Sequence, residues 1–155
     1  MANPFTVIVE EGLPLFDVAP TAVATVSELP PGGPFPPVLN PVHSIRSDQT
    51  WGVQVKWATH GPLSPLLAGS WEVTVYMDRM GGGSFALPGN AQSTALVATS
   101  PANYTVNFTF PAGVVPAGAY RMAITITMRG PGPGFVPGPV GGVGDGPLLQ
   151  FYNAA

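Results

Sequence analysis

Residues 111–129 read PAGVVPAGAYRMAITITMR, and this stretch decides the expected fold class. Its first half is rich in proline and glycine, which interrupt regular structure and predict a tight corner in the chain. From Tyr120 to Arg129, large apolar side chains alternate with polar or small ones. An alternation with a period of two, built partly from β-branched residues, is typical of a strand that buries one face. The stretch therefore predicts a corner followed by a strand over residues 119–129.

Tyr120 opens this strand directly after the corner. A tyrosine in this position can bury its ring while its hydroxyl hydrogen-bonds to the main chain just upstream, which is the tyrosine corner of immunoglobulin-like sandwiches. On the segment PAGAYRMAITI, the sequence resembles bacterial immunoglobulin-like domains. The resemblance covers about residues 43–152 and implies an antiparallel β-sandwich. It implies little about function, because this architecture hosts many functions.

Three further segments show the same alternation of apolar and polar side chains. Residues 50–59 read TWGVQVKWAT, residues 71–78 read WEVTVYMD, and residues 103–110 read NYTVNFTF. Each segment collects aromatic and aliphatic side chains on one face, which predicts a strand that lies against a core. The core is expected to contain five large aromatic residues from these strands and from the strand over residues 119–129, namely Trp51, Trp57, Trp71, Tyr104 and Tyr120.

Long connections rich in glycine and proline separate the predicted strands. Residues 130–146 read GPGPGFVPGPVGGVGDG, show no strand pattern, and are predicted to form a loop. Residues 80–90 are predicted to form a second loop, and short strands are expected at residues 93–98 and 147–152. No helical periodicity of useful length appears. The predicted fold is an all-β, immunoglobulin-like antiparallel β-sandwich with an extended N-terminal segment.

The N-terminal segment, residues 1–41, differs in composition from residues 42–155. It carries four acidic residues and no basic one, and its residues 29–41, LPPGGPFPPVLNP, are dominated by proline. Residues 5–9 and 22–26 have the composition of short strands. One interpretation is a first strand and a loop within the same sheet; the other is an arm that packs on a neighbouring subunit. We expect a homo-oligomer in which this segment contacts a neighbour.

The composition restricts the protein to a few classes. The chain has 155 residues, which suits one domain with its own core. Charged residues make up 8% and hydrophobic residues 45%, which favours folded strands over disorder. The absence of cysteine excludes disulfides and thiolate metal sites. The net charge of −3, with no run of basic residues, argues against nucleic-acid binding.

The sequence shows no membrane-spanning or secretory signal. No uninterrupted apolar stretch is long enough for a membrane-spanning helix. The N-terminus has no basic region followed by an apolar run, so no signal peptide is predicted. The sequence does not indicate in which cellular compartment the protein is located.

Side chains that could perform catalysis or bind metals are scarce. The two histidines, His43 and His60, lie beside turns and are not spaced as a ligand pair, so we expect loop histidines, with a metal pair as the alternative. Glu72 and Asp78 are the candidate carboxylate pair, but alternation places Glu72 on the outward face of its strand. We therefore predict no catalytic residue, no cofactor and no metal, and a protein that is not an enzyme.

Two functions remain. The first is a structural or assembly role, as a self-associating subunit of a larger particle, shell or filament. A charge-poor surface with apolar glycine- and proline-rich loops supports it, because exposed apolar surface usually marks contacts. The alternative is an immunoglobulin-like module that binds carbohydrate or a protein partner. A carbohydrate platform would require Trp51, Trp57 and Trp71 to face outward.

Overall fold

A computed structural model describes residues 3–11, 17–18, 22–61, 69–130 and 137–153. All regular structure in these residues is β-strand, which confirms the predicted all-β class. In chain order the strands are β1 (Phe5–Glu11), β2 (Asp17–Val18), β3 (Ala22–Glu28), β4 (Ser44–Arg46), β5 (Trp51–His60), β6 (Ser70–Arg79), β7 (Gly83–Phe85), β8 (Ala91–Ala95), β9 (Ala102–Phe110), β10 (Gly118–Arg129) and β11 (Pro137–Tyr152).

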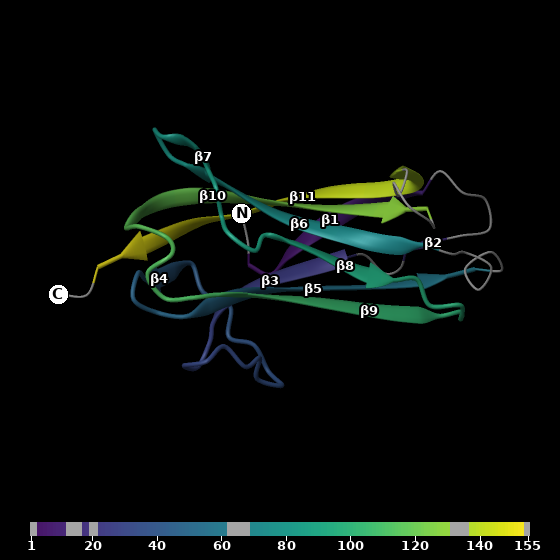
Figure 1. The fold of residues 1–155 in the computed structure, drawn as a ribbon, viewed down its shortest axis with the longest axis horizontal. Helices are drawn as coiled ribbons and strands as arrows, with labels where there is room; N and C mark the ends of the chain where they lie inside the picture. The colour runs from purple at the N-terminus through teal and green to yellow at the C-terminus, as the bar shows by residue number, and fades with distance from the viewer. Residues whose placement is uncertain (1–2, 12–16, 19–21, 62–68, 131–136, 154–155) are drawn as a thin grey trace.

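The described strands form one eleven-stranded sheet that curls over to make two layers (Figure 1). In one layer, β5 pairs with β3 on one side and β9 on the other. In the other layer, β10 pairs with β6 and β11, and β6 also pairs with β7 and β8. These pairs are antiparallel, whereas β4 runs parallel to the end of β11. The result is a curled, largely antiparallel sheet with its apolar faces turned toward each other.

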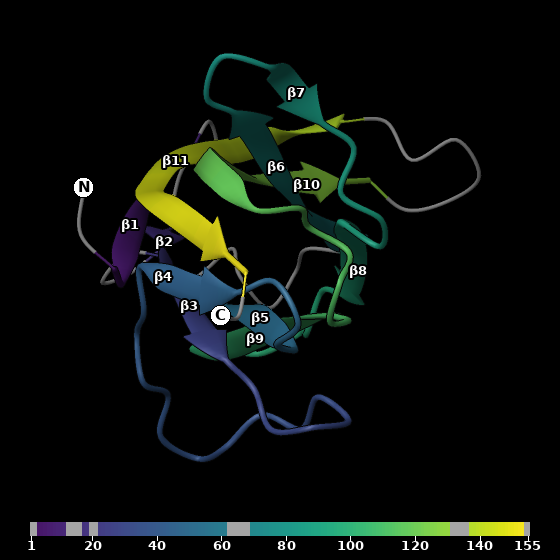
Figure 2. The same ribbon diagram turned by 90° about the vertical axis from the view of Figure 1, so that its left-hand side faces the viewer.

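Strand β1 joins the two layers along one side of the molecule. Residues 5–7 pair with β3, and residues 8–11 pair with β11 in the other layer. Figure 2 shows β1 at this side, between β11 above and β3 below. A single strand thus closes the gap between two sheet edges, which would otherwise expose unpaired backbone groups.

The core lies between the two layers and is rich in aromatic rings. Trp51, Trp57, Trp71, Tyr104 and Tyr120 are all buried, none with more than 4% of its surface exposed. The Trp57 ring stacks on Tyr104 at 5.3 Å and meets Trp71 edge to face at 5.7 Å. Such offset and edge contacts are the favoured aromatic geometries. Rings from β5, β6 and β9 therefore hold the two layers together.

The sequence predicts a loop over residues 130–146, and this prediction is wrong for residues 137–146. Residues 137–146 are instead the first part of β11. A Cβ atom at Gly142 would lie 2.5 Å from the carbonyl oxygen of Ile8, and one at Gly144 would lie 2.7 Å from Cγ2 of Val7. Real Cβ atoms do not approach so closely, so glycine allows β1 to cross here. Because glycine has no side chain, the strand shows no alternation in the sequence.

Both strands predicted in residues 1–41 pair within their own chain, as β1 and β3. The connection between β3 and β4 extends away from the layer that contains β5 (Figure 2). Its Phe35 ring lies over Gly52, where a Cβ atom would be 2.8 Å from Cζ of Phe35. A contact with a neighbouring subunit, and the division between residues 1–41 and 42–155, stay predictions.

Candidate functional site

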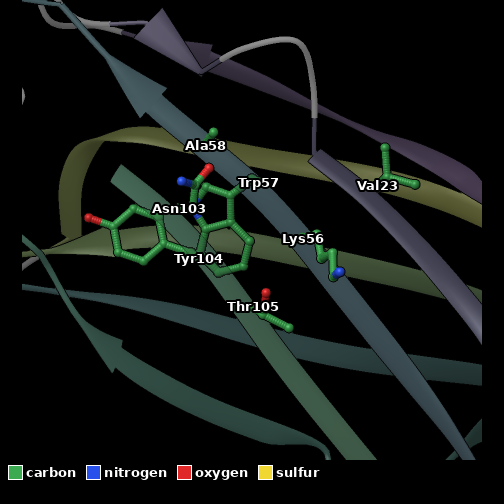
Figure 3. A pocket seen from close by; sticks show the side chains of 7 residues that line it. All are labelled: Val23, Lys56, Trp57, Ala58, Asn103, Tyr104 and Thr105. Atoms are coloured by element: carbon green, nitrogen blue, oxygen red, sulfur yellow. The ribbon is translucent and has the colours of Figure 1, made fainter. Parts of the chain in front are cut away.

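A shallow hollow on the outer face of the β3–β5–β9 layer has a volume of about 480 Å³. Strand alternation turns Trp57 and Tyr104 inward and leaves the flanking side chains on the outside. Ala58 lies opposite Asn103 in the β5–β9 register and is short, so it fills little of the space. The side chains of the hollow, drawn in Figure 3, are Val23, Lys56, Trp57, Ala58, Asn103, Tyr104 and Thr105.

The hollow offers three kinds of polar group. Lys56 and Thr105 are exposed, lie opposite each other across β5 and β9, and present an ammonium and a hydroxyl group. The Asn103 side chain adds an amide that can both donate and accept hydrogen bonds. This arrangement can hydrogen-bond a polar ligand, but it contains no nucleophile paired with a base.

A second hollow of about 370 Å³, between β6, β8 and β10, contains an ion pair. Nη2 of Arg129 lies 3.2 Å from Oε1 of Glu72, and both side chains are partly exposed. Partly exposed pairs of this kind contribute about 0–1 kcal/mol. The pair links β10 to β6 and is most simply a surface contact of the sheet.

The seam between β1 and β11 carries an apolar area, which we call the seam patch, formed by Ile8, Gly141, Gly142 and Val143. Ile8 and Val143 lie directly opposite each other in the antiparallel register. They expose 70% and 58% of their surfaces, respectively. The two glycines present bare backbone beside them. The four residues of the patch carry no charge, and the patch is suited to contact with another apolar surface.

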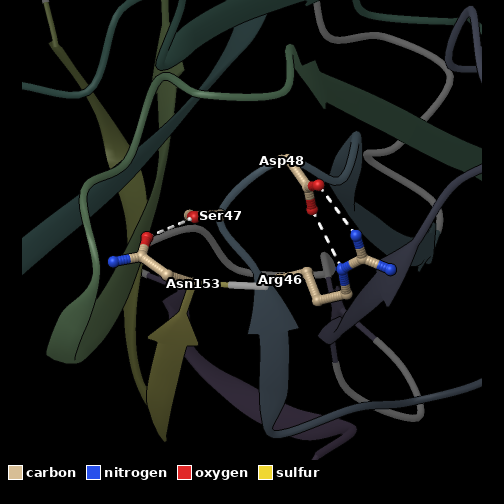
Figure 4. A network of polar contacts seen from close by, with 4 residues as sticks. All are labelled: Arg46, Ser47, Asp48 and Asn153. Carbon is tan, nitrogen blue, oxygen red and sulfur yellow. Dashed lines mark hydrogen bonds and ion pairs between the residues drawn. The ribbon is translucent and has the colours of Figure 1, made fainter. Parts of the chain in front are cut away.

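A polar network fastens the end of β11 to the turn after β4 (Figure 4). Arg46 donates two hydrogen bonds to Asp48, at 3.0 and 2.8 Å. The hydrogen bond and the negative charge of Asp48 raise the pKa of the Arg46 guanidinium. The hydroxyl of Ser47 donates to Oδ1 of Asn153 at 2.9 Å. The Ser47 main-chain N–H also donates to the carbonyl of Tyr152, so the network orders this turn.

The two histidines lie on different parts of the chain: His43 precedes β4, and His60 is the last residue of β5. His43 accepts a main-chain hydrogen bond from Gln150, next to Phe151, whose ring packs on Trp51 at the start of β5. His60 ends β5, and a strand of ten residues spans about 33 Å. No group of three or more potential metal ligands occurs among the described residues.

The other candidate residues are also separated or buried. Glu72 and Asp78 lie on the same strand, paired with Thr127 and Arg121, respectively, so they do not face each other. The three tryptophan side chains predicted to be core are buried and form no platform on the surface. No pattern in the sequence marks the seam patch, because its two glycines lie in a stretch that predicts a loop.

Comparisons with solved structures find likenesses to this chain, and one of them is described here. No model of a known protein family matches the sequence, and no curated protein matches it. The chain aligns with the crystal structure of the CARDB domain of the PF1109 protein from Pyrococcus furiosus, in complex with di-metal ions. The identity is 12% over 92% of this chain and 98% of that chain, with a TM-score of 0.40. A likeness at this level carries no argument about ligand, metal or function. The described residues contain no helix long and apolar enough to cross a membrane.

Proposed function

We propose that the chain is an immunoglobulin-like β-sandwich that acts as a non-enzymatic, self-associating subunit of a larger particle, shell or filament. Three strand pairings support the architecture: β5 pairs with β9 in one layer, and β10 pairs with both β6 and β11 in the other. The hydroxyl of Tyr120 at the start of β10 donates to the carbonyl of Pro116 at 2.8 Å, the expected tyrosine-corner bond.

The seam patch is the observation that carries the assembly function. A row of residues crosses four strands, with Thr74, Thr125, Val143 and Ile8 opposite one another in register. Thr74, at one end of the row, is already buried within the chain, so the surface available for a contact lies toward Val143 and Ile8. The row contains no charged side chain. Its burial in a contact would therefore remove apolar surface from water without desolvating a charge. Two of the four side chains are aliphatic and more than half exposed.

Val143→Asp tests this function directly. Val143 exposes 58% of its surface, so a carboxylate there should leave the fold intact but place a charge in the contact. We expect the wild-type protein to form oligomers or particles in light scattering and negative-stain images, and the variant to lose them at an unchanged melting temperature. The matched control is Leu148→Asp on the same strand, at a position 53% exposed and outside the patch.

Self-association is contradicted if the wild-type chain is monomeric at every concentration reached. Equal loss of particles in Val143→Asp and Leu148→Asp would place the contact elsewhere on the outer face. Persistence of particles in both variants would exclude the seam patch as the contact.

The alternative function is a binding module for carbohydrate or a protein partner, and the hollow on β5 and β9 is the observation that favours it. A polar ligand held by the amide of Asn103 should bind about ten-fold more weakly to Asn103→Ala, the usual effect of losing one hydrogen bond. A glycan array followed by calorimetry would measure this, with Asn153→Ala as a control outside the hollow. No binding by the wild-type chain would exclude the carbohydrate form of this function.

A further inference from the structure

The outer face of the β3–β5–β9 layer is covered at one end and open at the other. At the covered end, the Phe35 ring lies over Gly52, and the hydroxyl of Thr109 donates to the carbonyl of Gly33 at 3.3 Å. Both contacts are made by the connection between β3 and β4. The open end is the hollow of Figure 3, whose described lining side chains come from β3, β5 and β9. This end is therefore the part of the face that a ligand can reach.

The polar side chains of this face also differ between the two ends. Toward the covered end, the amide of Gln54 donates to Oδ1 of Asn107 at 3.0 Å, so these two side chains satisfy each other. At the open end, the side chains of Lys56, Asn103 and Thr105 make no hydrogen bond or ion pair with the described residues. Polar groups without a protein partner are hydrated, so a ligand with matching groups can take the place of water there.

Lys56 is the one charged side chain among the seven residues that line the hollow. Its neighbours across the sheet are Val23 on β3 and Thr105 on β9, and neither is acidic. An ammonium group without a counter-ion, in a hollow whose other lining residues are neutral, attracts a negatively charged ligand. The charge distribution therefore favours an anion over a neutral or cationic ligand.

The remaining groups indicate what the anion is attached to. The amide of Asn103 and the hydroxyl of Thr105 can donate and accept hydrogen bonds, which suits the hydroxyl groups of a saccharide. Val23 and Ala58 offer apolar surface to the C–H groups of a sugar ring. The volume of about 480 Å³ lies within the usual range for small-molecule sites, about 300–1,000 Å³. An acidic peptide has few hydroxyl groups to match these partners.

We propose that the hollow binds an acidic saccharide, whose carboxylate contacts Lys56 and whose hydroxyl groups contact Asn103 and Thr105. The inference rests on the alternative function proposed above, that of a binding module, and names the class of ligand and the residue that selects it.

Calorimetry on the full chain tests the proposal, with a disaccharide of hexuronic acids and the matched neutral disaccharide of hexoses as probes. We expect the acidic disaccharide to bind about five-fold more tightly, the upper value for one exposed ion pair. The preference should shrink as the salt concentration rises, because exposed charges are screened. It should disappear in Lys56→Met and remain in Lys56→Arg, which keeps the charge.

Two further variants show where the acidic disaccharide binds. Arg121→Met is the matched control, because Arg121 is exposed but lies on β10 in the other layer, and it should leave both affinities unchanged. Thr105→Val removes a hydroxyl at nearly constant shape and should weaken both disaccharides equally, with the preference retained. If Lys56→Met removes the preference but Thr105→Val changes neither affinity, the ligand lies outside the hollow and the proposal is wrong.

The possible failures of this proposal and of the proposed functions are distinguishable. Equal binding of the two disaccharides by the wild-type chain would overturn the acidic ligand and leave the carbohydrate-binding function standing. No binding of either would overturn both. Binding of a glutamate-rich peptide in place of either saccharide, with the same dependence on Lys56, would assign the hollow to a protein partner and overturn the saccharide. Particle formation should be unchanged in Lys56→Met, because Lys56 lies outside the seam patch.

Discussion

The side chain of Tyr120 connects the corner that follows β9 to two other strands. Its hydroxyl holds the carbonyl of Pro116 at 2.8 Å, and its ring is fully buried. The ring meets Phe85 of β7 at 5.7 Å and Phe151 of β11 at 5.5 Å, both edge to face. One residue thereby combines a local hydrogen bond with contacts between distant parts of the chain, and it links the corner to the core.

Tyr120→Phe isolates the hydrogen bond from the packing. The ring stays buried, while the Pro116 carbonyl, in an exposed residue, can turn to water. We expect the free energy of unfolding to fall by about 1 kcal/mol, the usual net value of one hydrogen bond. Urea denaturation would measure it. Tyr76→Phe, at a position 51% exposed, is the control and should change little. If the free energy of unfolding falls no more in Tyr120→Phe than in the control, the hydrogen bond to Pro116 does not contribute to stability.

At the scale of elements, the Gly-rich part of β11 is stabilised by its neighbouring strands more than by its own side chains. Its glycines offer no side chains to the core, and glycine weakens strands elsewhere. The strand forms because β10 pairs along it on one side and β1 pairs with residues 140–143 on the other. Backbone hydrogen bonds and the close passage of β1 therefore replace side-chain packing in this part of the sheet.

Gly144→Ala and Gly141→Ala form a matched pair that tests this account. The two glycines lie on the same strand, but a Cβ atom at Gly144 would meet Val7 at 2.7 Å, whereas at Gly141 the nearest atom is 3.6 Å away. We expect Gly144→Ala to destabilise by about 1–3 kcal/mol through overpacking. Gly141→Ala should be neutral or slightly stabilising, because alanine reduces the entropy of the unfolded chain. Equal melting temperatures for both variants would contradict the close passage of β1.

At the scale of the whole molecule, β1 joins the edges of the two layers and also contributes Ile8 to the surface proposed to mediate assembly. Residues 5–7 belong to one layer and residues 8–11 to the other, so the strand holds two sheet edges at once. Its inward side chains enter the core, while Ile8 joins the exposed seam patch. The same segment therefore contributes to the stability of one subunit and to the surface proposed to meet the next.

The sequence by itself determined the elements with alternating side chains. Strands β5, β6, β9 and β10 were predicted from their period of two, because each packs a large apolar face against the core. The hydrogen bond of Tyr120 in the corner was also predictable from the sequence, because it joins residues only four apart in the chain. The short strands β2, β4 and β7 were missed because too few residues are present to show a period.

Only the tertiary structure decided which elements come together. Residues 5–7 pair with the nearby β3, but residues 8–11 and the Gly-rich start of β11 become strand through contacts between segments more than a hundred residues apart. Such contacts leave no local period in the sequence. The hollow and the seam patch were likewise unpredictable, because each is formed by side chains from two or three strands whose register the sequence does not state. Local alternation encodes which face of a strand is buried, but only packing selects its neighbour.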